Sequence, residues 1–85
     1  MKEQYVIKTR NDFVDEYMCF LENSQEFAFI PHHHSLPNSS FSAAYKFSSL
    51  DSAREALTQQ CVIDSKYKVD IYKVVQTLEY VERGV

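Results

Sequence analysis

The stretch AAYKFSSLDSAREALTQQ, residues 43–60, constrains the fold most, because a strand-like run leads directly into the start of a helix. Ser48 or Ser49 is suited to cap this helix, since a serine hydroxyl accepts a hydrogen bond from a free backbone N–H of the first turn. Asp51 falls in that turn, where a negative charge complements the helix dipole. We therefore predict a short strand over residues 44–47, a serine cap and one helix.

The apolar residues of the helical segment indicate its buried face. Leu50, Ala53, Leu57 and Cys61 recur every three or four residues, which is the spacing of one apolar stripe on a helix. Free cysteine is one of the most buried residue types, so Cys61 is interpreted as part of the core. The sequence predicts one short amphipathic helix packed through this stripe.

The chain before the helix is rich in residues that favour strands. Residues 5–21 predict a β-hairpin around the polar turn Arg10-Asn11-Asp12. A second turn at residues 22–25 and a third strand over residues 27–30 follow. The next segment, residues 31–42, contains both prolines and is predicted as a long loop, whose order the sequence leaves open.

The C-terminal run, residues 69–82, fits a helix and a strand about equally well by apolar spacing. Its content of β-branched and aromatic residues favours the strand. We predict one long strand with a bulge at Val74 and Val75. The whole chain, residues 1–85, is then a single α+β domain, with an antiparallel sheet of four to five strands and one helix on one face.

Composition excludes several classes of partner and compartment. The net charge of -3 lacks the clustered lysine and arginine that bind nucleic-acid backbones, so nucleic acid is an unfavoured partner. No apolar run approaches the about 20 residues that span a bilayer, and the N-terminus lacks signal-peptide features. Cys19 and Cys61 follow no paired spacing, which predicts free thiols and a cytoplasmic protein.

The triplet His32-His33-His34 is the most conspicuous candidate for metal binding. Adjacent side chains of an extended segment point to opposite sides, so only His32 and His34 converge. Neither Cys19 nor Cys61 has a second ligand near it in sequence. A zinc site is therefore a minor alternative, and we predict no metal and no cofactor.

No catalytic motif stands out, so we predict that the protein is not an enzyme. Phosphate-binding loops need glycines, whereas the one glycine of this chain is Gly84. Asp15 and Glu16 are adjacent on a strand and face opposite ways, which makes them a poor acid–base pair. The same carboxylates are expected to raise the pKa of Cys19 and disfavour a thiolate.

The strands carry apolar side chains on both faces, although one helix covers only part of one face. One face takes Phe13, Tyr17, Cys19 and Leu21, and the other takes Val14, Met18 and Phe20. An exposed apolar face usually marks an interaction site, so we predict an interface and most simply a homodimer. The alternative is that the loop, through Leu36 and Phe41, covers this face.

Three segments, YVIKTRNDFVDEY, AYKFSSLDSAREAL and KVDIYKVVQTLEYVE, resemble small, mostly uncharacterised accessory proteins of phages and prophages of Gram-positive bacteria. The PHHHSLPNSS segment is not part of that pattern. The resemblance implies a protein that binds a host protein stoichiometrically, as some inhibitors of bacterial defence systems such as CRISPR nucleases do. It implies no active site.

These lines together predict a protein-binding module that docks on a host protein and modulates or inhibits it. The alternative is a small-molecule or nucleic-acid-binding module that uses an aromatic sheet face. Tyrosine suits an interface because it buries a large ring and keeps a polar tip. The predicted partner-binding residues are Tyr17, His32, His33, His34, Phe41, Tyr72 and Tyr80.

Overall fold

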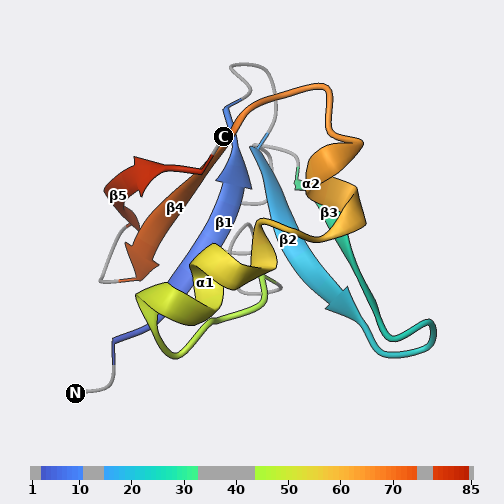
Figure 1. Cartoon of the computed structure of the whole chain (residues 1–85), viewed down its shortest axis with the longest axis horizontal. Helices are drawn as coiled ribbons and strands as arrows, with labels where there is room; N and C mark the ends of the chain where they lie inside the picture. The colour runs from blue at the N-terminus through green and yellow to red at the C-terminus, as the bar shows by residue number, and fades with distance from the viewer. Residues whose placement is uncertain (1–2, 11–14, 33–43, 75–77, 85) are drawn as a thin grey trace.

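The protein forms a five-stranded antiparallel sheet with two short helices on one face (Figure 1). The computed structural model describes residues 3–10, 15–32, 44–74 and 78–84. The strand order is β3-β2-β1-β4-β5, so β3 and β5 form the edges. The predicted α+β class and strand number are confirmed. The strands are β1 (Tyr5–Thr9), β2 (Asp15–Leu21), β3 (Glu26–His32), β4 (Val69–Val74) and β5 (Leu78–Arg83), and the helices are α1 (Leu50–Ala56) and α2 (Gln60–Ile63).

The antiparallel pairing of the N-terminal strands agrees with the predicted hairpins, and Asn11 and Asp12 of the first predicted turn lie outside the described residues. β1 and β2 are antiparallel and pair at Lys8 and Tyr17, and β2 continues through residues 22–25 into β3. The second turn contains Gln25 at a φ of 57°, and its side-chain amide donates a 2.7 Å hydrogen bond to the Glu22 carbonyl. β3 extends through Pro31 and His32, which the sequence had placed in the loop. Proline is compatible with this strand because β3 lies at the sheet edge.

The C-terminal run forms two strands, so the prediction of one long strand is wrong. β4 and β5 pair antiparallel, and residues 75–77 between them lie outside the described residues. Val75-Gln76-Thr77 contains no glycine, proline, asparagine or aspartate, which are the residues that indicate a turn. The bulge is also not at Val74 and Val75, where it was predicted. Ile71 pairs with Glu82 but Tyr72 pairs with Tyr80, which leaves Val81 as the extra residue.

Residues 44–47 do not form the predicted fourth strand. Phe47 makes a single antiparallel bridge to Tyr5, with both N–H···O distances at 2.8 Å. The Tyr45 N–H donates to the Met18 carbonyl of β2 at 3.0 Å. β1 and β2 diverge at this end of the sheet (Figure 1), and the segment hydrogen-bonds to both. Because its backbone hydrogen bonds go to two different strands, the segment does not pair along either of them as a strand.

The predicted helix begins where expected and then divides into two. The Ser52 N–H donates to Ser49 Oγ at 3.1 Å, which identifies Ser49 as the cap, and Asp51 lies in the first turn. After Leu57 the backbone tightens, because the Thr58 N–H bonds to the carbonyl three residues earlier, that of Glu55. The Thr58 hydroxyl also donates to this carbonyl at 2.8 Å. This local competition ends α1, and α2 restarts at Gln60.

The apolar side chains form one cluster on each face of the sheet. One cluster lies under the helices. Its fully buried residues are Ile7, Met18, Ala53, Val69 and Ile71. Leu50, Leu57 and Cys61, the remaining residues of the predicted stripe, pack against it although they are split between the two helices.

The second cluster consists of Val6, Tyr17 and Ala44, with Tyr72 and Val74 packed against it. Val6 is fully buried and Tyr17 is 2% exposed. The centre of the second face is thus not an exposed apolar surface, contrary to the expectation. Phe13, Val14, Leu36 and Phe41, which also entered that argument, lie outside the described residues.

Candidate partner-binding groove

Four aromatic side chains from three segments meet at the edge of the helix-covered face. Phe20 of β2 and Phe27 of β3 are register partners, and their ring centroids lie 5.1 Å apart in an edge-to-face arrangement. Tyr45 and Phe47 come from the segment that fills the gap before α1. Aromatic pairs at such distances are attractive beyond their burial. We call Phe20, Phe27, Tyr45 and Phe47 the aromatic cluster.

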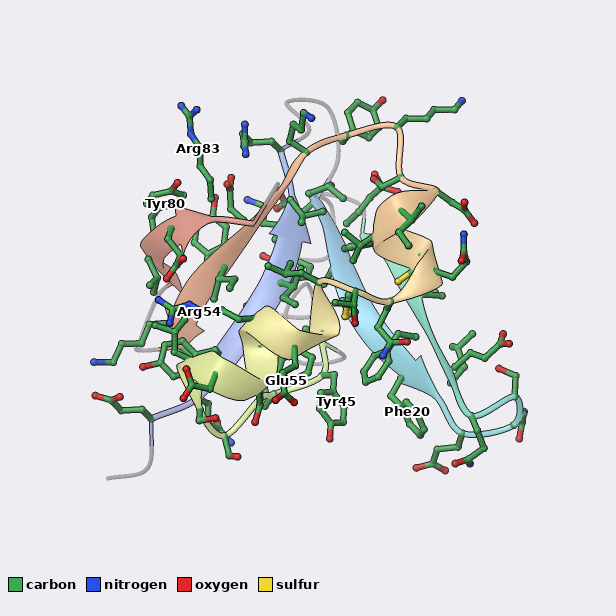
Figure 2. All side chains as sticks on the ribbon, viewed as in Figure 1. Phe20, Tyr45, Arg54, Glu55, Tyr80 and Arg83 are labelled. Atoms are coloured by element: carbon green, nitrogen blue, oxygen red, sulfur yellow. The ribbon has the colours of Figure 1, made fainter. Side chains whose placement is uncertain are left out.

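Tyr45, like Phe27, contacts the other three rings of the aromatic cluster. Its centroid lies 4.8 Å from Phe47, 5.3 Å from Phe27 and 6.1 Å from Phe20. Phe47 is buried at the base, whereas Tyr45 is 41% exposed. Tyr45 lies below α1 next to Glu55, and Phe20 lies near the end of β2 (Figure 2). Phe47 is therefore the buried part of the aromatic cluster, and Tyr45 is its exposed part.

A groove of about 570 Å³ lies between this cluster and the first helix. Phe27, Tyr45 and Phe47 form its aromatic side. A polar rim faces them, contributed by α1 and the residues after it: Ser52, Glu55, Thr58 and Gln59, with Ala56 between them. Aromatic walls with a few polar groups are typical of ligand-binding pockets, in which the polar groups fix the orientation of the ligand. We call this hollow the aromatic groove.

A second hollow of about 330 Å³ continues the aromatic groove toward α2. The two share Phe27 and Gln59, so they are contiguous over the Phe27 ring. The second hollow is also lined by Glu26, Gln60, Cys61 and Asp64. Together their lining residues come from β3, from both helices and from the segment before α1.

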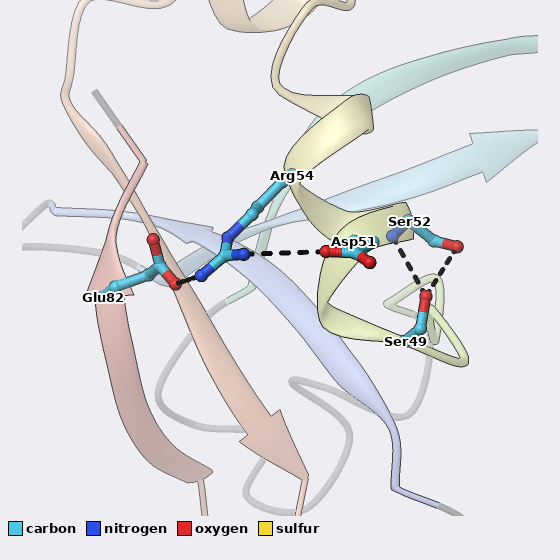
Figure 3. A network of polar contacts seen from close by, with 5 residues as sticks. All are labelled: Ser49, Asp51, Ser52, Arg54 and Glu82. Atoms are coloured by element: carbon cyan, nitrogen blue, oxygen red, sulfur yellow. Dashed lines mark hydrogen bonds and ion pairs between the residues drawn. The ribbon is translucent and has the colours of Figure 1, made fainter.

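Polar contacts fix the helix that forms the groove wall (Figure 3). Arg54 Nη2 lies 2.6 Å from Glu82 Oε1, which ties α1 to β5. Its Nη1 lies 3.6 Å from Asp51 Oδ1 on the same helix. The hydrogen bond with Glu82 raises the pKa of Arg54. Ser49 caps α1 at its start and Arg54 connects it to β5, and Glu55 lies on this same helix.

The predicted tyrosines lie on the opposite face of the sheet. Tyr17 is buried, so its interpretation as an exposed contact residue is wrong. Tyr72 and Tyr80 are cross-strand partners with ring centroids 5.6 Å apart, and Tyr80 is 50% exposed. Lys8 Nζ lies 5.3 Å from the Tyr72 ring centroid and 3.1 Å from Asp15 Oδ1. The structure thus brings Tyr72 and Tyr80 together, away from the aromatic groove.

The other predicted contact residues are not placed by the structure. His32 ends β3, and its side chain lies outside the described part. His33, His34 and Phe41 also lie outside the described residues. Within the described ranges, no three histidine, cysteine, aspartate or glutamate side chains are grouped to hold a metal ion. None of the described helices has the length and apolar content needed to cross a membrane.

The two cysteines are free thiols that contribute to packing. Burial raises the pKa of the Cys19 thiol, and Lys46 opposes this shift. The predicted direction is therefore confirmed, but its cause is burial rather than the neighbouring carboxylates. Burial also raises the pKa of Cys61, which packs against the core.

Sequence reasoning missed Phe20 and Phe27 of the aromatic cluster, and Tyr45 and Glu55, which line the aromatic groove. A signal for one contact was present, because a hairpin turn at residues 22–25 places Phe20 opposite Phe27. The position of Tyr45 had no such signal, since it depends on the divergence of β1 and β2. Comparisons with protein-family models, with curated proteins and with solved structures gave no match to this chain.

Proposed function

We propose that this protein is a protein-binding module that docks on its partner through the aromatic groove. The observation that carries the proposal is the arrangement of Tyr45, whose ring is held by three other aromatic rings while 41% of the residue stays exposed. Large aromatic side chains beside a pocket are typical of residues that dominate binding energy. A ring already fixed by its neighbours loses little conformational entropy on binding.

The nature of the partner follows from the groove and from the resemblance. Glu55 on the rim disfavours phosphate groups, so a protein segment suits the groove better than a nucleic acid. The resemblance to phage accessory proteins points to a host protein that is modulated or inhibited without catalysis. The free thiols support a cytoplasmic site of action.

Self-association through the other face is a second candidate. Tyr80 is half-exposed on β5, and β5 is an edge of the sheet. An edge strand offers backbone groups for pairing with a second copy. Light scattering tests this directly. A dimer that Tyr80→Ser converts to a monomer supports it, and a monomeric wild-type protein at high concentration rejects it.

Quantitative affinity purification from a lysate of a Gram-positive bacterium tests the proposed function. Tagged wild-type protein is compared with Tyr45→Ser and with the matched control Tyr80→Ser, which removes a tyrosine of similar exposure from the opposite face. We expect one stoichiometric protein that is lost with Tyr45→Ser and retained with Tyr80→Ser. Circular dichroism verifies that both variants are folded. A partner that is lost only with Tyr80→Ser, or the absence of any specific protein, contradicts the proposal.

A further inference from the structure

The charges around the aromatic groove all have the same sign. The charged residues that line the two contiguous hollows are Glu55 in the first and Glu26 and Asp64 in the second. Among the described lining residues there is no lysine or arginine. Lys46 lies between Tyr45 and Phe47 in sequence, but its ammonium donates to the Ala44 carbonyl at 2.6 Å and interacts with Cys19 on β2. The groove is thus an aromatic surface with an acidic rim.

Five carboxylates elsewhere in the described structure form ion pairs within the chain. Glu3 pairs with Lys73, Asp15 with Lys8, Asp70 with Arg10, and both Asp51 and Glu82 with Arg54. Within the described residues, Glu26, Glu55 and Asp64 form no such ion pair, and Asp64 only accepts a hydrogen bond from Gln60. Three carboxylates without an ion pair therefore line the two contiguous hollows.

We infer that the occupant of the aromatic groove is a segment of the partner protein in which an arginine is flanked by apolar residues. This inference rests on the proposed function. A guanidinium is planar, so it stacks on the exposed Tyr45 ring and at the same time donates hydrogen bonds to the Glu55 carboxylate. Apolar neighbours of the arginine then contact Phe20 and Phe27. Lysine suits the site less well, because its ammonium is strongly hydrated and does not stack.

Two short peptides that differ only in charge test the inference. The probes are acetyl-Leu-Arg-Leu-amide and acetyl-Leu-citrulline-Leu-amide, since citrulline has nearly the shape of arginine without its charge. Each is titrated into isotopically labelled protein while amide and aromatic NMR signals are followed. We expect the arginine peptide to shift the signals of Phe27, Tyr45 and Glu55 saturably, with an affinity about two- to five-fold above that of citrulline. High salt should reduce this difference.

Charge variants of the protein test which carboxylate causes the preference for the arginine peptide. Glu55→Gln should remove most of the preference for arginine, and the exposed hairpin carboxylate provides a matched control, Glu22→Gln, that should retain it. Glu55 and Glu22 are both exposed, so neither change should affect folding. Tyr45→Ser should weaken binding of both peptides about tenfold or more.

Equal affinity for the two peptides, or an unchanged preference in Glu55→Gln, overturns the assignment of an arginine. Signals that shift at Tyr72 and Tyr80 instead, or no saturable shift with the arginine peptide, overturn it as well. These outcomes are distinguishable from failure of the proposed function. A partner that is captured through Tyr45 but binds Glu55→Gln as tightly as wild-type protein retains the docking function and rejects the arginine.

Discussion

Ser49 shows how one side chain decides the start of a helix. Its hydroxyl accepts from the Ser52 N–H at 3.1 Å and also donates to the Ser52 hydroxyl at 2.9 Å. The adjacent Ser48 is equally suited by residue type, but the described structure gives it no capping contact. The choice between the two serines depends on where the backbone turns into the helix, which residue type alone does not reveal.

Ser49→Ala should therefore lower the free energy of unfolding by about 1 kcal/mol, because one N–H of the first turn loses its acceptor. Ser48→Ala is the matched control and should change it by less than about 0.5 kcal/mol. Urea denaturation followed by circular dichroism measures both. Equal effects of the two substitutions would show that the cap is wrongly assigned.

The buried thiol of Cys19 predicts how its reactivity depends on pH. Because burial raises the pKa of its thiol, less thiolate is present at a given pH than in an exposed cysteine. Alkylation by iodoacetamide near pH 8.5, the ordinary thiol pKa, should be slower in the folded protein than in urea. The rate should keep rising above that pH, and peptide mass spectrometry follows it. A folded-state rate at Cys19 that equals the denatured rate contradicts the account.

At the scale of elements, alternation and turn residues predicted the first two hairpins, because each has a polar turn between β-forming runs. The same reasoning failed for the last two strands. Val75-Gln76-Thr77 contains no turn-forming residue, so the sequence predicts one strand where the structure has β4 and β5. The division between α1 and α2 depends on backbone bonds at Thr58, which apolar spacing does not register.

The Tyr72–Tyr80 pair tests the register of that last hairpin. Their rings lie 5.6 Å apart with planes at 77°, an edge-to-face contact across β4 and β5. A double-mutant cycle with Tyr72→Ala and Tyr80→Ala should give a coupling free energy of about 0.5–1 kcal/mol. Urea denaturation of the four proteins measures it. Strictly additive effects would mean that the bulge at Val81 is misplaced, since a shift of one residue separates the rings.

At the scale of the whole molecule, the candidate site is a product of the tertiary fold. The aromatic groove combines an edge hairpin, the segment between two diverging strands, and a helix from the crossover between β3 and β4. Tyr45 and Phe27 are far apart in sequence, and no local pattern relates them. The sequence predicted the class of fold. The position of the aromatic groove depends on the topology, which the sequence did not predict.

Site-specific photo-crosslinking tests whether the partner docks at the aromatic groove. Benzoylphenylalanine replaces Tyr45 in one protein and Tyr80 in another, and each is irradiated in cells of a Gram-positive host. We expect one discrete crosslinked partner from position 45, lost when Glu55→Arg is added to reverse the rim charge, and none from position 80. Crosslinks to a partner from position 80 alone, or from neither position, would contradict the claim that the aromatic groove is the docking site.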